Sequence, residues 1–224
     1  MTATNYNSPF GRQGTRLMAV LALFMFTSTV QARQDDQRNP VAETDAGTHG
    51  FLMHARTGAL GVGYKGDHDG SGASGGFRLG YALNEHWSLF VGLEGSSGVE
   101  GGGDFDGLPD NADYAFGFVD FGARYHFRPQ HRWMPFAEAA FSVMGLSYDG
   151  DLRVDNKEVT YGGFGASLAG GVSYFVLPKL AIEGSTIFTP GAMLFKEIGS
   201  SDTDINLGTA GVRLSLGLSW YPFR

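Results

Sequence analysis

The feature that most constrains this chain is a repeated alternation of apolar and non-apolar residues. The clearest case is residues 77–83, where Phe77, Leu79, Tyr81 and Leu83 occupy every second position. A period of two predicts a β-strand with one apolar face. The same period recurs over residues 87–93, 119–127, 137–143, 164–176, 180–188 and 210–220. With a less regular first strand within residues 51–64, the pattern predicts eight strands.

The segments that join these strands alternate in length. Long polar connectors span residues 65–74, 97–113, 149–160 and 189–204, whereas residues 84–86, 128–133 and 177–179 are short. An even number of antiparallel strands, with long loops at one end and tight turns at the other, is typical of bacterial outer-membrane barrels. The sequence therefore predicts an all-β fold, an eight-stranded antiparallel up-and-down transmembrane β-barrel over residues 51–224.

A soluble eight-stranded barrel is the alternative. It would need an apolar interior and a polar exterior, whereas a lipid-facing strand leaves small and polar residues for the interior. The faces opposite the apolar ones include Gly163, Gly165 and Ser167 on one strand and Gly211, Arg213 and Ser215 on another. These faces are too small and polar for a soluble core, so we expect the apolar faces to contact lipid.

Eight charged residues fall within the predicted strands. Seven lie on the face opposite the apolar one: Arg78, Glu94, Asp120, Arg124, Glu138, Glu183 and Arg213. Because a buried charge is costly unless it is paired, we expect these seven to form an ion-pair network inside a plugged lumen. The eighth, Arg56, shares its parity with Leu60, Val62 and Tyr64 and has no assigned face unless a bulge near Gly58 shifts the register. A solute channel is the alternative, but the narrow bore of eight strands opposes it.

The N-terminus indicates export. Arg12 and Arg16 precede an apolar run at residues 17–26, and small residues lead to Ala32, which predicts a signal peptide over residues 1–32. The apolar run is shorter than the roughly 20 residues that a transmembrane helix needs. Residues 33–50 are polar and predict a flexible periplasmic leader. After cleavage the net charge would be −9, which disfavours nucleic acid as a partner.

Two stretches resemble a known family. Residues 121–148, "FGARYHFRPQHRWMPFAEAAFSVMGLSY", and the C-terminal "LSLGLSWYPFR" are similar to the bacterial outer-membrane β-barrel domain family, which includes the OmpA transmembrane domain and opacity porin-like proteins. The resemblance implies location in the cell outer membrane, contact with outer-membrane lipid and lipopolysaccharide, and recognition of the C-terminal strand by the insertion machinery. Members typically end on an aromatic residue, whereas this chain ends on Phe223-Arg224.

Candidate sites outside the predicted network are weaker. Some small outer-membrane barrels that modify lipid A use an outward His–Ser pair, and none of the six histidines here forms one on an outward strand face. We therefore expect no enzyme and no cofactor. The acidic loops supply weak candidate metal ligands, namely Asp104, Asp106, Asp110, Asp149 and Asp151, for which solvated loops are the simpler interpretation. Aromatic residues near strand ends predict interfacial girdles: Trp87, Tyr125, Phe127, Tyr174 and Trp220.

These features predict a non-enzymatic barrel that serves membrane integrity or surface interaction through acidic loops, with a surface ligand that the sequence does not name. The alternative function is a narrow pore, or a lateral conduit for small hydrophobic molecules.

Overall fold

A computed structural model describes residues 50–64, 68–102, 113–129, 131–148, 159–198 and 201–222. The predicted signal peptide and all but the last residue of the predicted leader lie outside these ranges. The described residues form eight strands: β1 (Gly50–Tyr64), β2 (His68–Ala82), β3 (Trp87–Gly102), β4 (Asp113–His126), β5 (Trp133–Tyr148), β6 (Val159–Leu177), β7 (Leu180–Ile198) and β8 (Ser201–Trp220). Within the described part of the chain, no helix is long and apolar enough to cross a membrane.

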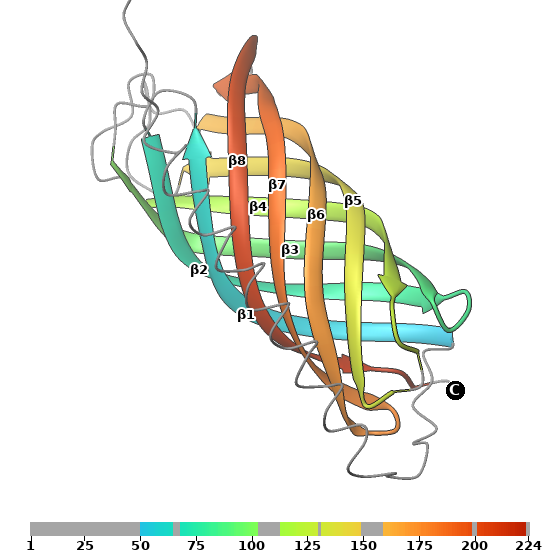
Figure 1. Cartoon of the computed structure of the whole chain (residues 1–224). Helices are drawn as coiled ribbons and strands as arrows, with labels where there is room; N and C mark the ends of the chain where they lie inside the picture. The colour runs from blue at the N-terminus through green and yellow to red at the C-terminus, as the bar shows by residue number, and fades with distance from the viewer. Residues whose placement is uncertain are drawn as a thin grey trace, which may run out of the picture. The chain divides into compact units, whose positions relative to one another are not determined.

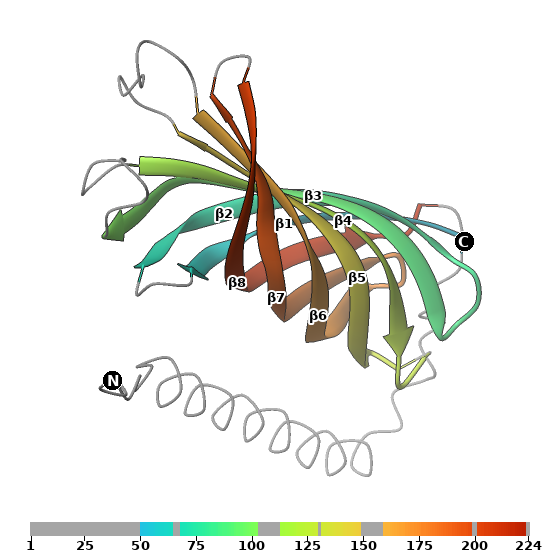
Figure 2. The same ribbon diagram turned by 90° about the horizontal axis from the view of Figure 1, so that it is seen from above.

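The strands close into a barrel in which each pairs antiparallel with its neighbours in sequence and β8 pairs with β1. In Figures 1 and 2, β5–β8 of one wall cross β1–β4 of the other wall at a steep angle. Such crossing follows from the tilt that strands need to close a barrel of this size. The predicted up-and-down eight-stranded barrel is therefore confirmed.

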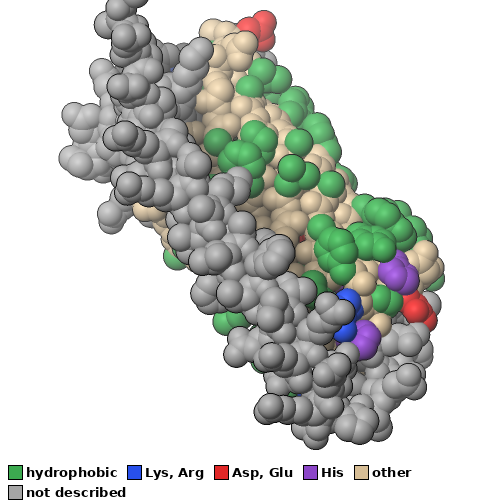
Figure 3. Space-filling view, viewed as in Figure 1, with side chains coloured by type: hydrophobic (Ala, Val, Ile, Leu, Met, Phe, Trp, Pro, Cys, Tyr) green, Lys and Arg blue, Asp and Glu red, His purple; other side chains and the backbone are tan. Residues whose placement is uncertain are grey.

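The outer surface is apolar along the predicted faces. Leu93, Leu168 and Leu216 expose 57, 60 and 61% of their surface, values that would be costly in water over a whole wall. Figure 3 shows hydrophobic side chains spread over the side of the barrel that it presents. The charged side chains of the strand centres point the other way and are buried. An apolar exterior around a charged interior is the arrangement that lipid selects.

The strands extend further toward the long loops than the alternation indicates. The predicted connector of residues 65–74 is mostly strand, because β2 already begins at His68 and Tyr64 pairs with His68. Likewise the predicted connector of residues 189–204 leaves only residues 199 and 200 between β7 and β8. Above the bilayer the outer face meets water, so the backbone ladder can continue there without apolar side chains. Apolar alternation thus marks the lipid-facing length of a strand rather than the whole strand.

The first strand assigns a face to Arg56, which parity in the sequence leaves unassigned. β1 pairs with β2 and with β8 in an unbroken register, so no bulge occurs at Gly58. Arg56, Leu60 and Val62 all point into the barrel and are buried. The apolar parity of Leu60 and Val62 therefore does not mark the lipid face, since the interior near the long loops is itself apolar. Arg56 is an interior residue like the other seven.

Candidate functional site

All eight charged residues of the strand centres are buried inside the barrel, with at most 7% exposure. They form two clusters, each with two arginines and two carboxylates. The turn-side ion cluster consists of Arg78, Arg124, Glu138 and Glu183; the loop-side ion cluster consists of Arg56, Glu94, Asp120 and Arg213. With every group ionised, each cluster is electrically neutral. The seven residues named from the sequence, together with Arg56, thus lie within these two clusters.

The turn-side ion cluster is held by paired contacts. Arg78 donates from Nη1 and Nη2 to the two oxygens of Glu138 at 2.5 and 3.0 Å. Arg124 donates from Nε to Glu138 at 2.6 Å and from Nη1 and Nη2 to the two oxygens of Glu183 at 2.7 and 2.9 Å. Ser173 adds a hydroxyl hydrogen bond to Glu183 at 2.8 Å. Such bidentate contacts satisfy both charges and fix the geometry of the arginines.

The loop-side ion cluster centres on Arg213. Its Nη1 donates to Glu94 Oε2 at 3.0 Å and to Asp120 Oδ2 at 2.9 Å, and Arg56 Nη2 lies 2.5 Å from the same Glu94 oxygen. Its Nη2 donates to two hydroxyl groups, Ser167 Oγ and Thr189 Oγ1, at 3.0 and 2.9 Å. A chain of hydroxyl groups, Thr189–Ser167–Ser142, continues to Asp120 with contacts of 2.6 Å each. Residues from four strands, β3, β4, β6 and β7, therefore bind one guanidinium group directly.

Aromatic rings cover three of the arginines, which the sequence reasoning missed. The guanidinium carbons of Arg78, Arg124 and Arg213 lie 3.9, 3.9 and 4.0 Å from the ring centroids of Phe90, Phe136 and Phe118, respectively. Stacking of this kind stabilises a desolvated guanidinium through the negative face of the ring. The inward parity of these phenylalanines was visible in the sequence, but which arginine each would cover depends on pairing across the barrel.

Glycines make room for two of these rings. A Cβ added to Gly122 would lie 2.6 Å from Cζ of Phe90, and one added to Gly171 would lie 2.5 Å from Cζ of Phe136. Both glycines face the interior, where any side chain would displace a ring that covers an arginine. At these positions glycine therefore shapes the ion clusters through close approach.

Apolar side chains fill the interior at both ends. The loop-end apolar cluster contains Leu60, Val62, Phe116, Phe118, Met144, Leu146, Tyr161 and Met193. The turn-end apolar cluster contains Leu52, Met134, Phe175, Ala181 and Tyr221. A purely small and polar lumen was expected from the sequence, and that expectation is wrong. The ion clusters instead lie between two apolar layers, which lowers the dielectric around them and strengthens their pairing.

Among the described residues, the contacts of His54 with a serine and an acid invite comparison with a catalytic triad. Its Nδ1 lies 2.7 Å from Ser219 Oγ and 3.1 Å from Glu183 Oε2. In a catalytic triad the serine and the acid bind opposite nitrogens of the imidazole, so that one receives the proton while the other orients the ring. Here both partners share one nitrogen, and the histidine is only 4% exposed inside the barrel. The arrangement is that of a structural hydrogen-bond junction.

The predicted interfacial aromatics gather at the turn end of the barrel. Trp87 begins β3 and packs against Tyr125 with ring centroids 5.0 Å apart, and Tyr125 contacts Phe127 at 5.2 Å. Tyr174 packs against Trp133 at 4.6 Å, and Trp220 ends β8 with 49% exposure. Half-exposed aromatic rings at one level of a barrel wall fit an interfacial girdle, which sets the height of the barrel in the bilayer.

The weak metal candidates Asp104, Asp106, Asp110, Asp149 and Asp151 lie outside the described residues. Among the residues that the structure does describe, no three His, Asp or Glu side chains are grouped so that they could hold a metal ion.

Comparisons with known proteins agree with this architecture. Among solved structures, Neisserial surface protein A matches with a TM-score of 0.56 and 16% identity, covering 76% of this chain and 96% of that one. The outer membrane protein OprG from Pseudomonas aeruginosa matches with a TM-score of 0.53 and 12% identity, covering 79% of this chain and 99% of that one. At these identities the likeness concerns the fold. No curated protein sequence matches this chain significantly.

A family model described as the outer membrane protein beta-barrel domain matches residues 18–219, which is most of the sequence. The description of this family indicates the outer membrane as the location. The chain therefore belongs to the outer membrane protein beta-barrel domain family.

Proposed function

We propose that this protein is a non-enzymatic barrel with a plugged lumen, which serves the integrity of the outer membrane or surface interaction through its acidic loops. The observation that carries the proposal is the filling of the interior by two neutral ion clusters between two apolar layers. The interior of an eight-stranded barrel is only wide enough for its own side chains. A solute would have to break several charge-assisted hydrogen bonds to pass.

The polar residues of the interior also support a structural role. Ser142, Ser167 and Thr189 bind one another and the loop-side ion cluster, and none of the three is more than 4% exposed. One ring nitrogen of His54, Nδ1, contacts both Ser219 and Glu183. A nucleophile needs an accessible site beside it for the reacting atom of a substrate, and these buried hydroxyl groups have none.

Surface interaction is assigned to the loops because their composition is strongly acidic. The four predicted long connectors, which comprise the loops and the strand ends next to them, hold fourteen acidic and four basic residues. Divalent cations that bridge these acids to lipopolysaccharide phosphates would give the loops an anchor on the outer leaflet. The predicted orientation, with long loops outside and short turns in the periplasm, is the one that bacterial barrels share.

Conductance measurements test the plugged lumen. Purified protein inserted into planar bilayers is expected to show no steady large openings, because the ion clusters block the bore. A known open porin measured in the same bilayers would serve as the positive control. Steady openings at the scale of the porin would contradict a plugged barrel.

A second function, lateral entry of small hydrophobic molecules, is favoured by one observation. The backbone pairing of β6 and β7 is interrupted between the pairs Gly165↔Gly191 and Leu168↔Phe188, where Pro190 lies on β7, although the side chains of Ser167 and Thr189 form a hydrogen bond across this step. Proline has no amide hydrogen and cannot donate to a ladder. On the inner side, a Cβ at Gly191 would lie 2.4 Å from Cε of Met144, so a flexible methionine backs the interruption. A small apolar molecule would enter the loop-end apolar cluster here.

A disulfide across the interruption tests this second function. The chain has no cysteine, and Leu168 of β6 pairs with Phe188 of β7 at the edge of the interruption, so Leu168→Cys/Phe188→Cys can be oxidised to close the seam while Pro190 is kept. Under lateral entry, closure slows the uptake of a small apolar dye into vesicles carrying the protein, and reduction restores it. Ala123→Cys/Ala139→Cys, which joins paired residues of β4 and β5, is the matched control. Equal uptake before and after oxidation would contradict lateral entry.

A further inference from the structure

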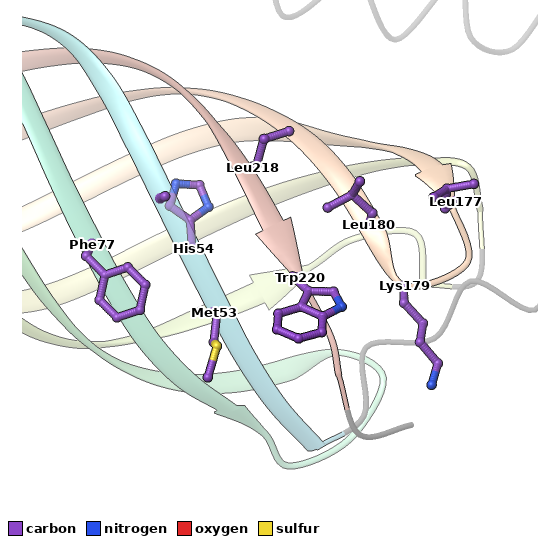
Figure 4. A pocket seen from close by; sticks show the side chains of 9 residues that line it. Met53, His54, Phe77, Leu177, Lys179, Leu180, Leu218 and Trp220 are labelled. Atoms are coloured by element: carbon purple, nitrogen blue, oxygen red, sulfur yellow. The ribbon is translucent and has the colours of Figure 1, made fainter.

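A pocket of about 540 Å³ lies on the outer wall at the turn end, across the seam where β1 meets β8 (Figure 4). Its origin is a small residue between two large ones. Ala55 of β1 pairs with Phe77 of β2 on one side and with Leu218 of β8 on the other, and all three line the pocket. Because Ala55 is short, the wall is hollowed between the two larger side chains. We name this hollow the seam groove.

The next row of outward side chains bounds the groove toward the turn end. Met53 pairs with Trp220, which in turn pairs with Leu180 of β7, and all three line the groove. Trp220 and Phe77 are about half exposed. An apolar groove on a wall that faces lipid takes a hydrocarbon chain, because water is absent at that depth.

Among the described residues, one cation lies at the turn side of this groove. Lys179 lines it from the β6–β7 turn, and in Figure 4 its amino group points away from the barrel wall. Two hydrogen bonds link the turn to the last described residues: the Tyr221 backbone amide donates to the Lys179 carbonyl at 2.9 Å, and the Lys179 side-chain ammonium donates to the Pro222 carbonyl at 3.3 Å. The cation therefore lies at the turn end of the groove, beside the interfacial aromatic Trp220.

We propose that the seam groove is a binding site for one anionic glycerophospholipid of the inner leaflet. One acyl chain lies over Ala55, between Phe77 and Leu218, and the phosphate binds the ammonium group of Lys179. Charge complementarity selects this occupant. The described turns carry Arg128, Arg132 and Lys179 against one acid, Glu85, so the turn end attracts anionic headgroups, and Lys179 alone among these cations lines the groove.

The site is separate from the proposed structural role of the lumen, because the side chains that would contact the lipid face outward; of the lining residues, His54 is the one that faces inward, toward Glu183. If no lipid binds in the seam groove, the proposed structural role of the lumen is unaffected. A bound lipid would cover the β1–β8 seam at the level of the turns.

Tryptophan quenching tests the site with the protein reconstituted in vesicles. Trp87→Phe/Trp133→Phe leaves Trp220 as the one tryptophan of the chain, and it lines the groove. Brominated phosphatidylglycerol and brominated phosphatidylcholine, each diluted into unbrominated phosphatidylcholine, are the probes. Quenching of Trp220 is expected to show about a fivefold higher relative affinity for phosphatidylglycerol, the effect of one lysine near an anionic surface.

Two variants in that background separate the headgroup from the groove. Lys179→Gln is expected to remove the preference for phosphatidylglycerol, while Arg132→Gln, which removes a charge from another turn, leaves it intact. Ala55→Phe fills the hollow between Phe77 and Leu218, so it is expected to exclude the acyl chain and reduce the quenching of Trp220 by both brominated lipids. Heat-modifiable gel migration verifies that each variant is folded. A protein retaining only Trp87, at the same end but outside the groove, supplies the reference.

Three outcomes would overturn the proposal. The first is equal quenching of Trp220 by both lipids. The second is an equal loss of preference in Lys179→Gln and Arg132→Gln, which would indicate a general surface potential. The third is the same preference at Trp87 as at Trp220.

Discussion

Arg124→Met is expected to lower the free energy of unfolding of the barrel by about 3–5 kcal/mol, the usual cost of removing one partner from a buried ion pair. Arg124 donates to Glu138 once and to Glu183 twice, and it is fully enclosed. After the substitution Glu138 retains Arg78, but Glu183 retains only Ser173 and His54. The turn-side ion cluster would carry an uncompensated negative charge.

Equilibrium unfolding by urea in phospholipid vesicles, followed by tryptophan fluorescence, measures this change. Arg132→Met is the matched control, because Arg132 is exposed at a turn and its loss should cost less than about 1 kcal/mol. Arg124→Met/Glu183→Gln removes one charge of each sign and should be more stable than Arg124→Met alone. Equal effects of Arg124→Met and Arg132→Met would show that the cluster does not stabilise the barrel.

Glu94→Gln is expected to lower the free energy of unfolding by about 2–4 kcal/mol, since two buried arginines bind the same carboxylate oxygen. Arg56 and Arg213 contact Glu94 Oε2 at 2.5 and 3.0 Å. With an amide at position 94, Asp120 alone would balance both arginines, and it lies 3.7 Å from Arg56. A neutral amide keeps the shape of the side chain, so the loss reports on charge rather than on packing.

The unfolding temperature of Glu94→Gln should fall relative to the unmodified barrel. Glu197→Gln, which removes an exposed carboxylate of β7, is the control and should change stability by less than about 0.5 kcal/mol. Glu94→Gln/Arg56→Met restores neutrality in the loop-side ion cluster and should recover part of the loss. An unchanged unfolding temperature in Glu94→Gln would mean that this cluster does not hold the barrel together.

Much of the fold could be predicted because lipid and lumen impose opposite chemistry on alternate residues. Seven interior charges, from Arg78 to Arg213, were assigned by parity alone, and the structure buries each of them. Their pairing could not be assigned in this way. Arg124 meets Glu183 three strands away, and Arg213 meets Glu94 across the bore, contacts that depend on the stagger of the strands rather than on position along each one.

The failures have a common physical cause. Arg56 has no face assigned by parity because it shares its parity with the apolar Leu60 and Val62, and the predicted connectors of residues 65–74 and 189–204 are largely strand. Both cases concern the barrel near its loops, where the outer face meets water and the interior is apolar. Near the loops the alternation of apolar outward and polar inward residues is weakened or inverted. Parity therefore no longer indicates which residues face outward.

The loop-side ion cluster takes one arginine from the first strand and one from the last. Glu94 and Asp120 lie on β3 and β4, whereas Arg56 lies on β1 and Arg213 on β8. A growing sheet that lacks β8 therefore exposes two carboxylates with a single cation to balance them. The loop-side ion cluster becomes neutral only when β8 pairs with β1. A sheet that has not closed therefore carries an unpaired carboxylate, which raises its free energy in a low-dielectric environment. Closure of the barrel and neutralisation of the charges on its inner surface therefore occur in the same step in this protein.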